Sequence, residues 1–233
     1  MWGYVRQTEA KHTRVYLTAE EIEGVPFLIL CCGQEATRYG RWQVKRGLKK
    51  MAAYGVRQVI VPPAWEEMSR AAGLQPVYDT LLRQALLEPI LNRFCEQNGL
   101  DIHRSAVRLC AREVNQTVQQ AAELLAHRAR YVQLSVDRGE EKLSEWLRRN
   151  YGLSAGQGGR GVLMQVCCDG AFTKGVPALW LGRDCQKYQR VNYQLREPWS
   201  SRIEENAGLF AVLFAEGKLP VEAFAVKSVE SYA

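Results

Sequence analysis

The sequence predicts an α/β protein of two units with mostly parallel sheets and a small antiparallel addition at the N-terminus. Two features of the 233-residue chain lead to this fold class. Short β-branched runs alternate with longer segments of helical periodicity, an alternation typical of parallel sheets. The alternation starts again near residue 100, and no linker rich in Pro, Gly or Ser precedes the restart. We therefore expect an N-terminal α/β domain over 1–98 and a C-terminal α/β domain over 100–233.

The first residues predict the antiparallel addition. Residues 2–6 and 14–18 are short aromatic and β-branched runs with polar flanks, like strands with one solvent-exposed face. Residues 25–32 are predominantly apolar, which indicates a strand buried on both faces. The expected elements that follow are a helix over 36–54, a strand over 57–61, a helix over 65–72, a strand over 74–78 and a helix over 81–97. Pro89 should kink or divide the last helix.

Beyond residue 100 the same alternation predicts the second unit. Asn115 or Thr117 is expected to cap its first helix, since both side chains can accept a hydrogen bond from a free backbone N–H. The expected strands cover 105–110, 131–136, 162–167, 177–181, 191–195 and 224–229, and the helices cover 118–129, 140–150 and 207–216.

Composition and charge exclude several classes of protein. Residues 1–99 carry 13 basic and 10 acidic side chains and residues 100–233 carry 18 and 15, so each part has a net charge of +3 and neither forms a polybasic arm. No stretch approaches the ~18–20 apolar residues of a membrane span, and we expect no membrane partner. The odd number of cysteines, seven, argues against a complete disulfide framework. We expect reduced thiols and a cytoplasmic location.

Residues 105–150 contain a strand, a capped helix, a second strand that ends at Asp137, a turn and a second helix. This order resembles the first half of a Rossmann-type dinucleotide-binding domain, so the C-terminal unit is similar to a degenerate member of the Rossmann-like nucleotide-binding superfamily. The resemblance implies that Asp137 holds the ribose hydroxyls of a nucleotide and that Arg138 suits a 2′-phosphate.

The glycine-rich fingerprint of that superfamily is absent. Its place is taken by Cys-Ala-Arg-Glu-Val-Asn-Gln-Thr over 110–117, which contains no glycine to let a backbone approach a pyrophosphate. Glu113 adds a negative charge at the same place. NAD(P) therefore remains a cofactor that the resemblance suggests and the turn disfavours, and the sequence leaves the cofactor open.

The other glycine cluster, Gly156 to Gly161, follows a helix and leads into a strand. Phosphate-binding loops have the opposite order, a strand followed by a helix, so we interpret this segment as a connection. No metal is expected, because the chain lacks C-x-x-C and H-E-x-x-H motifs and its three histidines are not at ligand spacing.

Candidate catalytic residues follow two apolar strands. Cys31 and Cys32 end one strand, and Cys168 with Asp169 ends another. If these strands are parallel, both groups lie at carboxyl ends, where α/β sheets bind ligands. A thiolate there is a candidate nucleophile, and the alternative is that these thiols pack in the core. His103 is the best candidate for a general base.

The predicted helix over 38–50 is the one concentrated group of positive charges. Arg38, Lys45, Arg46 and Lys49 fall on one side of it and form a candidate polyanion-binding surface. A solvated helix face has the same pattern. Only Tyr39 and Trp42 interleave with these cations as stacking platforms, so we do not expect nucleic acid as the partner.

The leading hypothesis is a regulatory or non-catalytic protein that binds a nucleotide or other small anionic ligand in the crevice between its two domains. Two alternatives remain open: a thiol-dependent or dehydrogenase-like enzyme, and an interaction protein that binds a polyanion through the helix over 38–50. A second copy of the chain is a further candidate partner, since the late aromatic residues Trp180, Tyr188, Tyr193 and Trp199 could form a homodimer contact.

Overall fold

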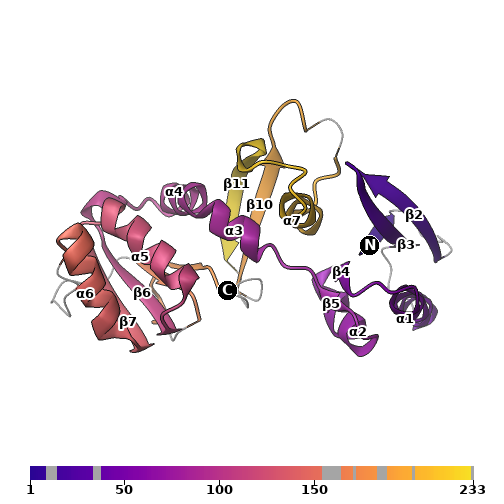
Figure 1. Cartoon of the computed structure of the whole chain (residues 1–233), viewed down its shortest axis with the longest axis horizontal. Helices are drawn as coiled ribbons and strands as arrows, with labels where there is room; N and C mark the ends of the chain where they lie inside the picture. Colours follow the sequence, from indigo (N-terminus) through magenta and orange to yellow (C-terminus); the bar gives the residue numbers. More distant parts are fainter. Residues whose placement is uncertain are drawn as a thin grey trace. The chain divides into compact units, whose positions relative to one another are not determined.

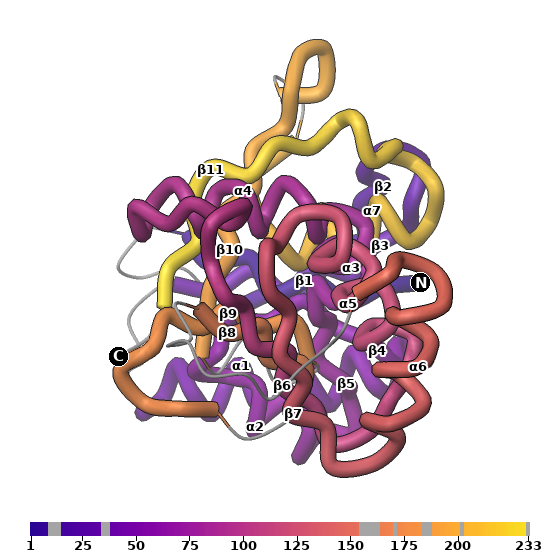
Figure 2. The backbone as a smooth tube through the Cα atoms, turned by 90° about the vertical axis from the view of Figure 1, so that its left-hand side faces the viewer, coloured from indigo at the N-terminus to yellow at the C-terminus, as the bar shows by residue number. Residues whose placement is uncertain are grey.

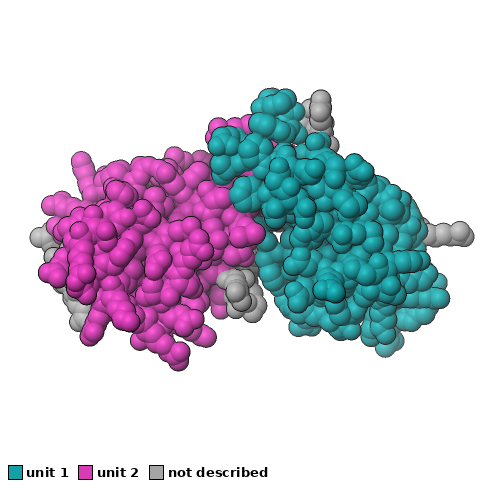
Figure 3. Space-filling model, viewed as in Figure 1, with its two compact units in different colours: residues 1–79, 197–223 teal, residues 80–196, 224–233 magenta. Residues whose placement is uncertain are grey.

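The structure is a computed structural model that describes residues 1–8, 15–33, 38–153, 164–169, 172–182, 188–200 and 203–231. The chain forms two compact units, Met1–Asp79 with Glu197–Ala223 and Thr80–Arg196 with Phe224–Ala233 (Figure 3). The division therefore differs from the expected domains 1–98 and 100–233. Residues 80–98 belong to the second unit, and the chain returns to the first unit between two strands of the second.

The first unit contains a five-stranded sheet in the order β2-β3-β1-β4-β5 (Figure 1). All neighbouring pairs are parallel except β2 and β3, so an antiparallel addition is present at the N-terminus, but it consists of β2 alone. The first strand, expected as part of that addition, instead lies inside the sheet and pairs in parallel with β3 and β4. The strands are β1 (Trp2–Thr8), β2 (Tyr16–Ile22), β3 (Val25–Gly33), β4 (Gln58–Ile60) and β5 (Gln75–Pro76). The helical elements are α1 (Arg38–Ala53), η1 (Pro63–Trp65), α2 (Glu66–Ala71), α7 (Ala207–Ala215) and η4 (Val221–Ala223).

Close contacts explain why these segments share a unit. Helix α1 packs so tightly on β3 that a Cβ at Gly47 would lie 2.5 Å from Leu30 Cδ1. Residues 197–223 are tied to the same sheet, since a Cβ at Gly208 would lie 2.6 Å from Ile60 Cγ2. The apolar face of α1 predicted from the periodicity, with Val44, Leu48 and Met51, is buried.

The second unit contains a four-stranded, entirely parallel sheet in the order β7-β6-β8-β9 and a separate antiparallel pair, β10 and β11. The strands are β6 (Ala106–Glu113), β7 (Tyr131–Arg138), β8 (Met164–Cys167), β9 (Ala178–Trp180), β10 (Gln189–Leu195) and β11 (Phe224–Ser231). The helical elements are α3 (Thr80–Ala85), α4 (Leu87–Gln97), η2 (Ile102–Arg104), α5 (Gln116–Arg128) and α6 (Glu140–Tyr151). The α/β fold class predicted from the sequence, with mostly parallel sheets, is confirmed.

Helices α3 and α4 belong to the second unit because of what their apolar side chains contact. Helix α4 lies beside β11 (Figure 2) and also contacts the parallel sheet, where Cys95 Sγ is 3.8 Å from Met164 Sδ. The expected division of the helix over 81–97 occurs at Leu86. Pro89 then lies in the first turn of α4, where its missing N–H leaves no hydrogen bond unmade.

The central strand β6 has two different faces. Val107, Leu109 and Ala111 are buried on one face. On the other face Arg108 is partly exposed and Arg112 is exposed, while Cys110 between them is buried in a cluster with Cys167 and Trp180. Helices α5 and α6 lie beside this sheet in Figure 1. Among the residues that the structure describes, no helix is long and apolar enough to cross a bilayer.

Candidate functional site

The carboxyl ends of β6, β7 and β8 meet at one edge of the parallel sheet. Strand β7 follows β6 in the chain and lies on one side of it, while β8 lies on the other side. The connections after β6 and β8 therefore leave in opposite directions, which is where open α/β sheets bind ligands. A hollow of about 340 Å³ lies at this edge, within the size range of small-molecule sites. This β6–β8 hollow is lined by Arg112, Glu113, Asp137, Arg138 and Asp169.

Backbone geometry holds the three strand ends together. The backbone N–H of Arg112 donates a hydrogen bond of 3.0 Å to Asp169 Oδ1, which ties the end of β8 to β6. Gly139, at the end of β7, has a φ of +87°, and a Cβ there would lie 3.1 Å from Val114 Cγ2. Glycine adopts this left-handed conformation without strain, and its lack of a side chain lets the turn after β7 approach the turn after β6.

The segment after β9 packs closely against the end of β8. A Cβ at Gly182 would overlap the carbonyl oxygen of Cys168, so only glycine fits there. The preceding residue, Leu181, donates its N–H to the Cys167 carbonyl at 2.9 Å. The position of Asp169 thus depends on a backbone packing that extends from β8 to the segment after β9.

Helix α5 begins directly beyond the hollow. Asn115 Oδ1 accepts a hydrogen bond of 3.0 Å from the N–H of Val118, so Asn115 is the N-cap, one of the two candidates predicted from the sequence. Thr117, the other candidate, instead accepts a hydrogen bond of 2.6 Å from Gln84 Nε2. The turn from β6 into α5 is therefore held by side chains rather than by a glycine-rich loop.

The lining of the β6–β8 hollow is polar, exposed and net negative. Glu113, Asp137 and Asp169 contribute three carboxylates, and Arg112 and Arg138 contribute two guanidinium groups. Carboxylates accept hydrogen bonds from hydroxyl groups, and a guanidinium group binds a single phosphate in a bidentate way. The excess of carboxylates opposes a ligand with several phosphates.

Some of the residues singled out in the sequence come together here. Asp137 and Arg138 line the hollow with Asp169, which the sequence analysis grouped with the thiols. Arg112 and Glu113, which stand where the glycine fingerprint is missing, were not predicted as lining residues. They were open to prediction, because they end a parallel strand beside the strand that carries Asp137.

The candidate thiols lie in two different units and are buried. Cys31 and Cys32 directly precede the last residue of β3 in the first unit, and Cys168 follows β8 in the second; each has 3% or less of its surface exposed. Burial raises the pKa of Cys32 to about 12 and that of Cys168 to about 12. A thiol with such a pKa is protonated near neutral pH, which argues against an activated thiolate at either position. Cys185 lies outside the described residues.

His103 lies at the opposite end of the sheet from the hollow. It belongs to η2, which precedes β6. Its backbone N–H, not its imidazole, donates a hydrogen bond of 3.0 Å to Asp101 Oδ1. It therefore does not join Asp169 or the thiols in one site. In the described part of the chain, no group of three His, Cys, Asp or Glu side chains is arranged to hold a metal ion. The glycine cluster 156–161 lies outside that part.

The four cations of the predicted polyanion surface are exposed on α1, in the first unit. They are Arg38, Lys45, Arg46 and Lys49. None of them lines the β6–β8 hollow, so the protein carries two candidate sites of different chemistry. Two residues considered for a homodimer contact, Trp180 and Tyr193, are largely buried.

No family model and no curated protein matches the chain. Similar solved structures include a shikimate 5-dehydrogenase-like protein, with 12% identity and a TM-score of 0.28 over 64% of this chain and 58% of that one. They also include L-tryptophan dehydrogenase from Nostoc punctiforme, with 11% identity and a TM-score of 0.33 over 84% of this chain and 57% of that one. The chain spans less than two thirds of either structure. At these TM-scores the likeness says nothing about activity, and the fold class rests on the strand order itself.

Proposed function

We propose that the second unit binds a ribose-bearing ligand, a nucleoside or nucleoside monophosphate, in the β6–β8 hollow and that this binding is regulatory rather than catalytic. The observation that carries the proposal is the position of Asp137. Its carboxylate ends the second strand of a β-α-β unit and lines a hollow where the strand order reverses. A carboxylate at that position is suited to accept hydrogen bonds from both ribose hydroxyls.

The other lining groups limit the number of phosphates that the ligand can carry. Arg138 and Arg112 supply positive charge for a single phosphate. Glu113 stands at the turn where a dinucleotide would place its pyrophosphate, and that turn contains no glycine to let the backbone approach it. The ligand therefore carries at most one phosphate, and NAD(P) is disfavoured by the same residues.

A binding role fits the chemistry of the lining. Among the described residues, the lining consists of five carboxylate and guanidinium side chains and includes neither a thiol nor an imidazole. Cys168 is the thiol nearest in sequence, and it is buried with a raised pKa. Binding alone changes the stability of the second unit through mass action, which gives the ligand a regulatory effect without a reaction.

Isothermal titration calorimetry with adenosine, AMP, NAD⁺ and NADP⁺ tests the proposal. Wild-type protein should bind AMP or adenosine, and Asp137→Asn should weaken that binding at least about tenfold, because hydrogen bonds to a charged acceptor are lost. The matched control is Asp101→Asn, an exposed carboxylate at the other end of the sheet. Asn keeps the capping role of Asp101, so this variant should bind like wild type.

Two results would oppose the proposal. If Asp137→Asn and the wild type bind AMP with equal affinity, Asp137 does not contact the ribose. Binding of NAD⁺ in clear preference to AMP would favour the dehydrogenase-like alternative, since Glu113 then fails to exclude a pyrophosphate.

A further inference from the structure

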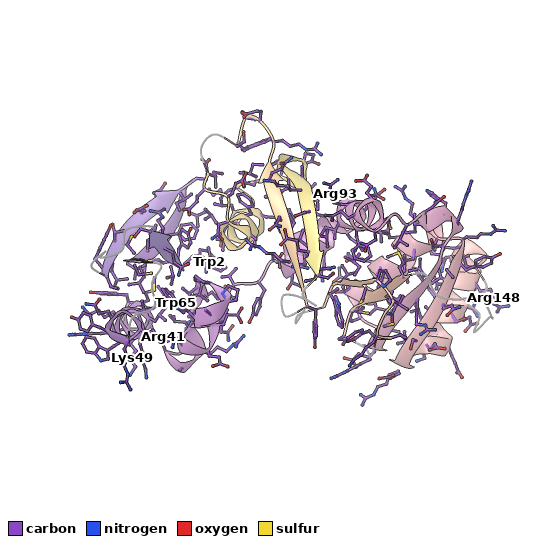
Figure 4. The ribbon with its side chains drawn as sticks, turned by 180° about the vertical axis from the view of Figure 1, so that it is seen from behind. Trp2, Arg41, Lys49, Trp65, Arg93 and Arg148 are labelled. Carbon is purple, nitrogen blue, oxygen red and sulfur yellow. The ribbon has the colours of Figure 1, made fainter. Side chains whose placement is uncertain are left out.

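The outer face of α1 carries a dense positive charge that no acidic side chain in the described ranges neutralises. Residues 36–65 contain no Asp or Glu. Six cations of α1 are exposed: Arg38, Arg41, Lys45, Arg46, Lys49 and Lys50. Lys49 extends away from the sheet (Figure 4). Within the described ranges none of the six forms an ion pair, whereas surface arginines elsewhere, such as Arg70 and Arg149, pair with glutamates of their own helices.

Two aromatic rings lie within this positive charge. Tyr39 and Trp42 stack with their centroids 5.9 Å apart and an interplanar angle of 22°. Both are exposed, Tyr39 by 68% and Trp42 by 53%. The Arg46 guanidinium lies 5.7 Å from the centre of the Trp42 ring. At about 100° per residue, Trp42 falls between Arg46 and Lys49 around the helix, so these three side chains share one face, while Arg41 lies at its margin beside the buried stripe.

The other face of α1 is already occupied. Val44, Leu48 and Met51 are buried in the core of the first unit, and Gly47 packs against Leu30. An amphipathic helix binds a bilayer by placing its apolar face among the lipids. That face of α1 is unavailable, and two stacked rings among six cations do not replace it.

We propose that the α1 surface, defined as Arg38, Tyr39, Arg41, Trp42, Lys45, Arg46, Lys49 and Lys50, binds single-stranded nucleic acid. The cations contact successive phosphates, and the exposed rings supply the flat surface on which unpaired bases stack. In a duplex the faces of the bases are covered by neighbouring bases, so they are not available to stack on Tyr39 and Trp42. The sequence alone left nucleic acid unexpected, because it does not show that both rings are exposed and stacked.

Fluorescence anisotropy with a labelled single-stranded 12-mer of DNA or RNA, and with a duplex of the same sequence, tests this proposal. Trp42→Ala should weaken single-strand binding at least about fivefold, because stacking on that ring is lost. Trp42→Phe should restore most of the affinity. The double variant Arg46→Gln/Lys49→Gln should reduce the slope of log affinity against log salt by about 1.4, the value for two single-strand phosphate contacts.

The matched control is Lys142→Gln/Arg148→Gln on α6, which removes the same charge from exposed positions of the second unit. It should leave both affinity and salt slope unchanged. Asp137→Asn should also bind the single strand like wild type, so this proposal and the ribose site fail separately.

Three results would overturn the proposal. The first is an affinity for the single strand that does not depend on salt. The second is an equal loss in the α1 and α6 double variants, which would show a nonspecific effect of net charge. The third is tighter binding to the duplex or to vesicles containing phosphatidylserine, with Trp42→Ala unchanged.

Discussion

Gly182→Ala should destabilise the second unit and displace Asp169 from the hollow. The added Cβ would overlap the Cys168 carbonyl oxygen and lie 2.6 Å from its carbon, and both are backbone atoms that no rotamer change can move aside. Relief of this overlap must separate the segment after β9 from the end of β8. The hydrogen bond of 2.9 Å from Leu181 N–H to the Cys167 carbonyl is the first contact at risk.

The size of the effect follows from these contacts. Overpacking costs about 1–3 kcal/mol, and a lost backbone hydrogen bond adds about 1 kcal/mol, so we expect a loss of roughly 3 kcal/mol in the free energy of unfolding. The matched control is Gly175→Ala. Its φ is +81° and a Cβ there meets nothing within 4 Å, so only backbone strain of about 1 kcal/mol is added.

Urea unfolding monitored by tryptophan fluorescence measures both variants, and calorimetry with AMP measures the site. Gly182→Ala should unfold at a clearly lower urea concentration than Gly175→Ala and should bind AMP more weakly. If the free energy of unfolding of Gly182→Ala lies within about 0.5 kcal/mol of the wild-type value, the backbones of Gly182 and Cys168 do not approach each other as closely as described.

Three further predictions concern the same unit. Burial raises the pKa of Cys168 from its ordinary value of 9.0 to about 12, so the folded state keeps a proton that the unfolded chain releases as the pH passes 9. The free energy of unfolding should therefore fall between about pH 9 and pH 12. Cys168→Ala should make this fall less steep, as measured by urea titrations at each pH. An equally steep fall in the variant would show that the buried Cys168 thiol is not its cause. Asn115→Ala should cost about 1 kcal/mol in thermal unfolding through loss of the α5 cap, whereas Asn115→Asp should keep it. Gln165→Leu should cost about 2–3 kcal/mol, because the fully buried amide pairs with the N–H and the carbonyl of Thr173 at 2.8 Å each; a loss under 0.5 kcal/mol would show that this connection is not held by Gln165.

The sequence predicted the fold class because periodicity reports burial directly. The buried strand β3 and the apolar face of α1 at Val44, Leu48 and Met51 follow from that signal alone. Periodicity does not report which sheet an apolar face will meet. The helix over 81–97 precedes the restart of the pattern and was assigned to the first domain, yet Cys95 packs against Met164 of the second unit.

The site was predictable only in part for a similar reason. Asp137 and Arg138 were expected because residues 105–150 resemble the first half of a Rossmann-type domain. Arg112 and Glu113 end the neighbouring strand and could have been expected on the same ground, whereas Asp169 joins them through the lateral pairing of β8 with β6, which no local pattern encodes. The return of residues 197–223 to the first unit is likewise set by contacts such as Gly208 with Ile60 rather than by local sequence.

The central claim is that the β6–β8 hollow binds a ribose-bearing ligand, and an NMR titration of the ¹⁵N-labelled protein with AMP tests it most directly. The account predicts chemical-shift changes concentrated at the backbone amides of Arg112, Glu113, Asp137, Arg138 and Asp169. These changes should all fit one dissociation constant, equal to that measured by calorimetry. Shifts confined to α1, or none at millimolar AMP, would contradict it.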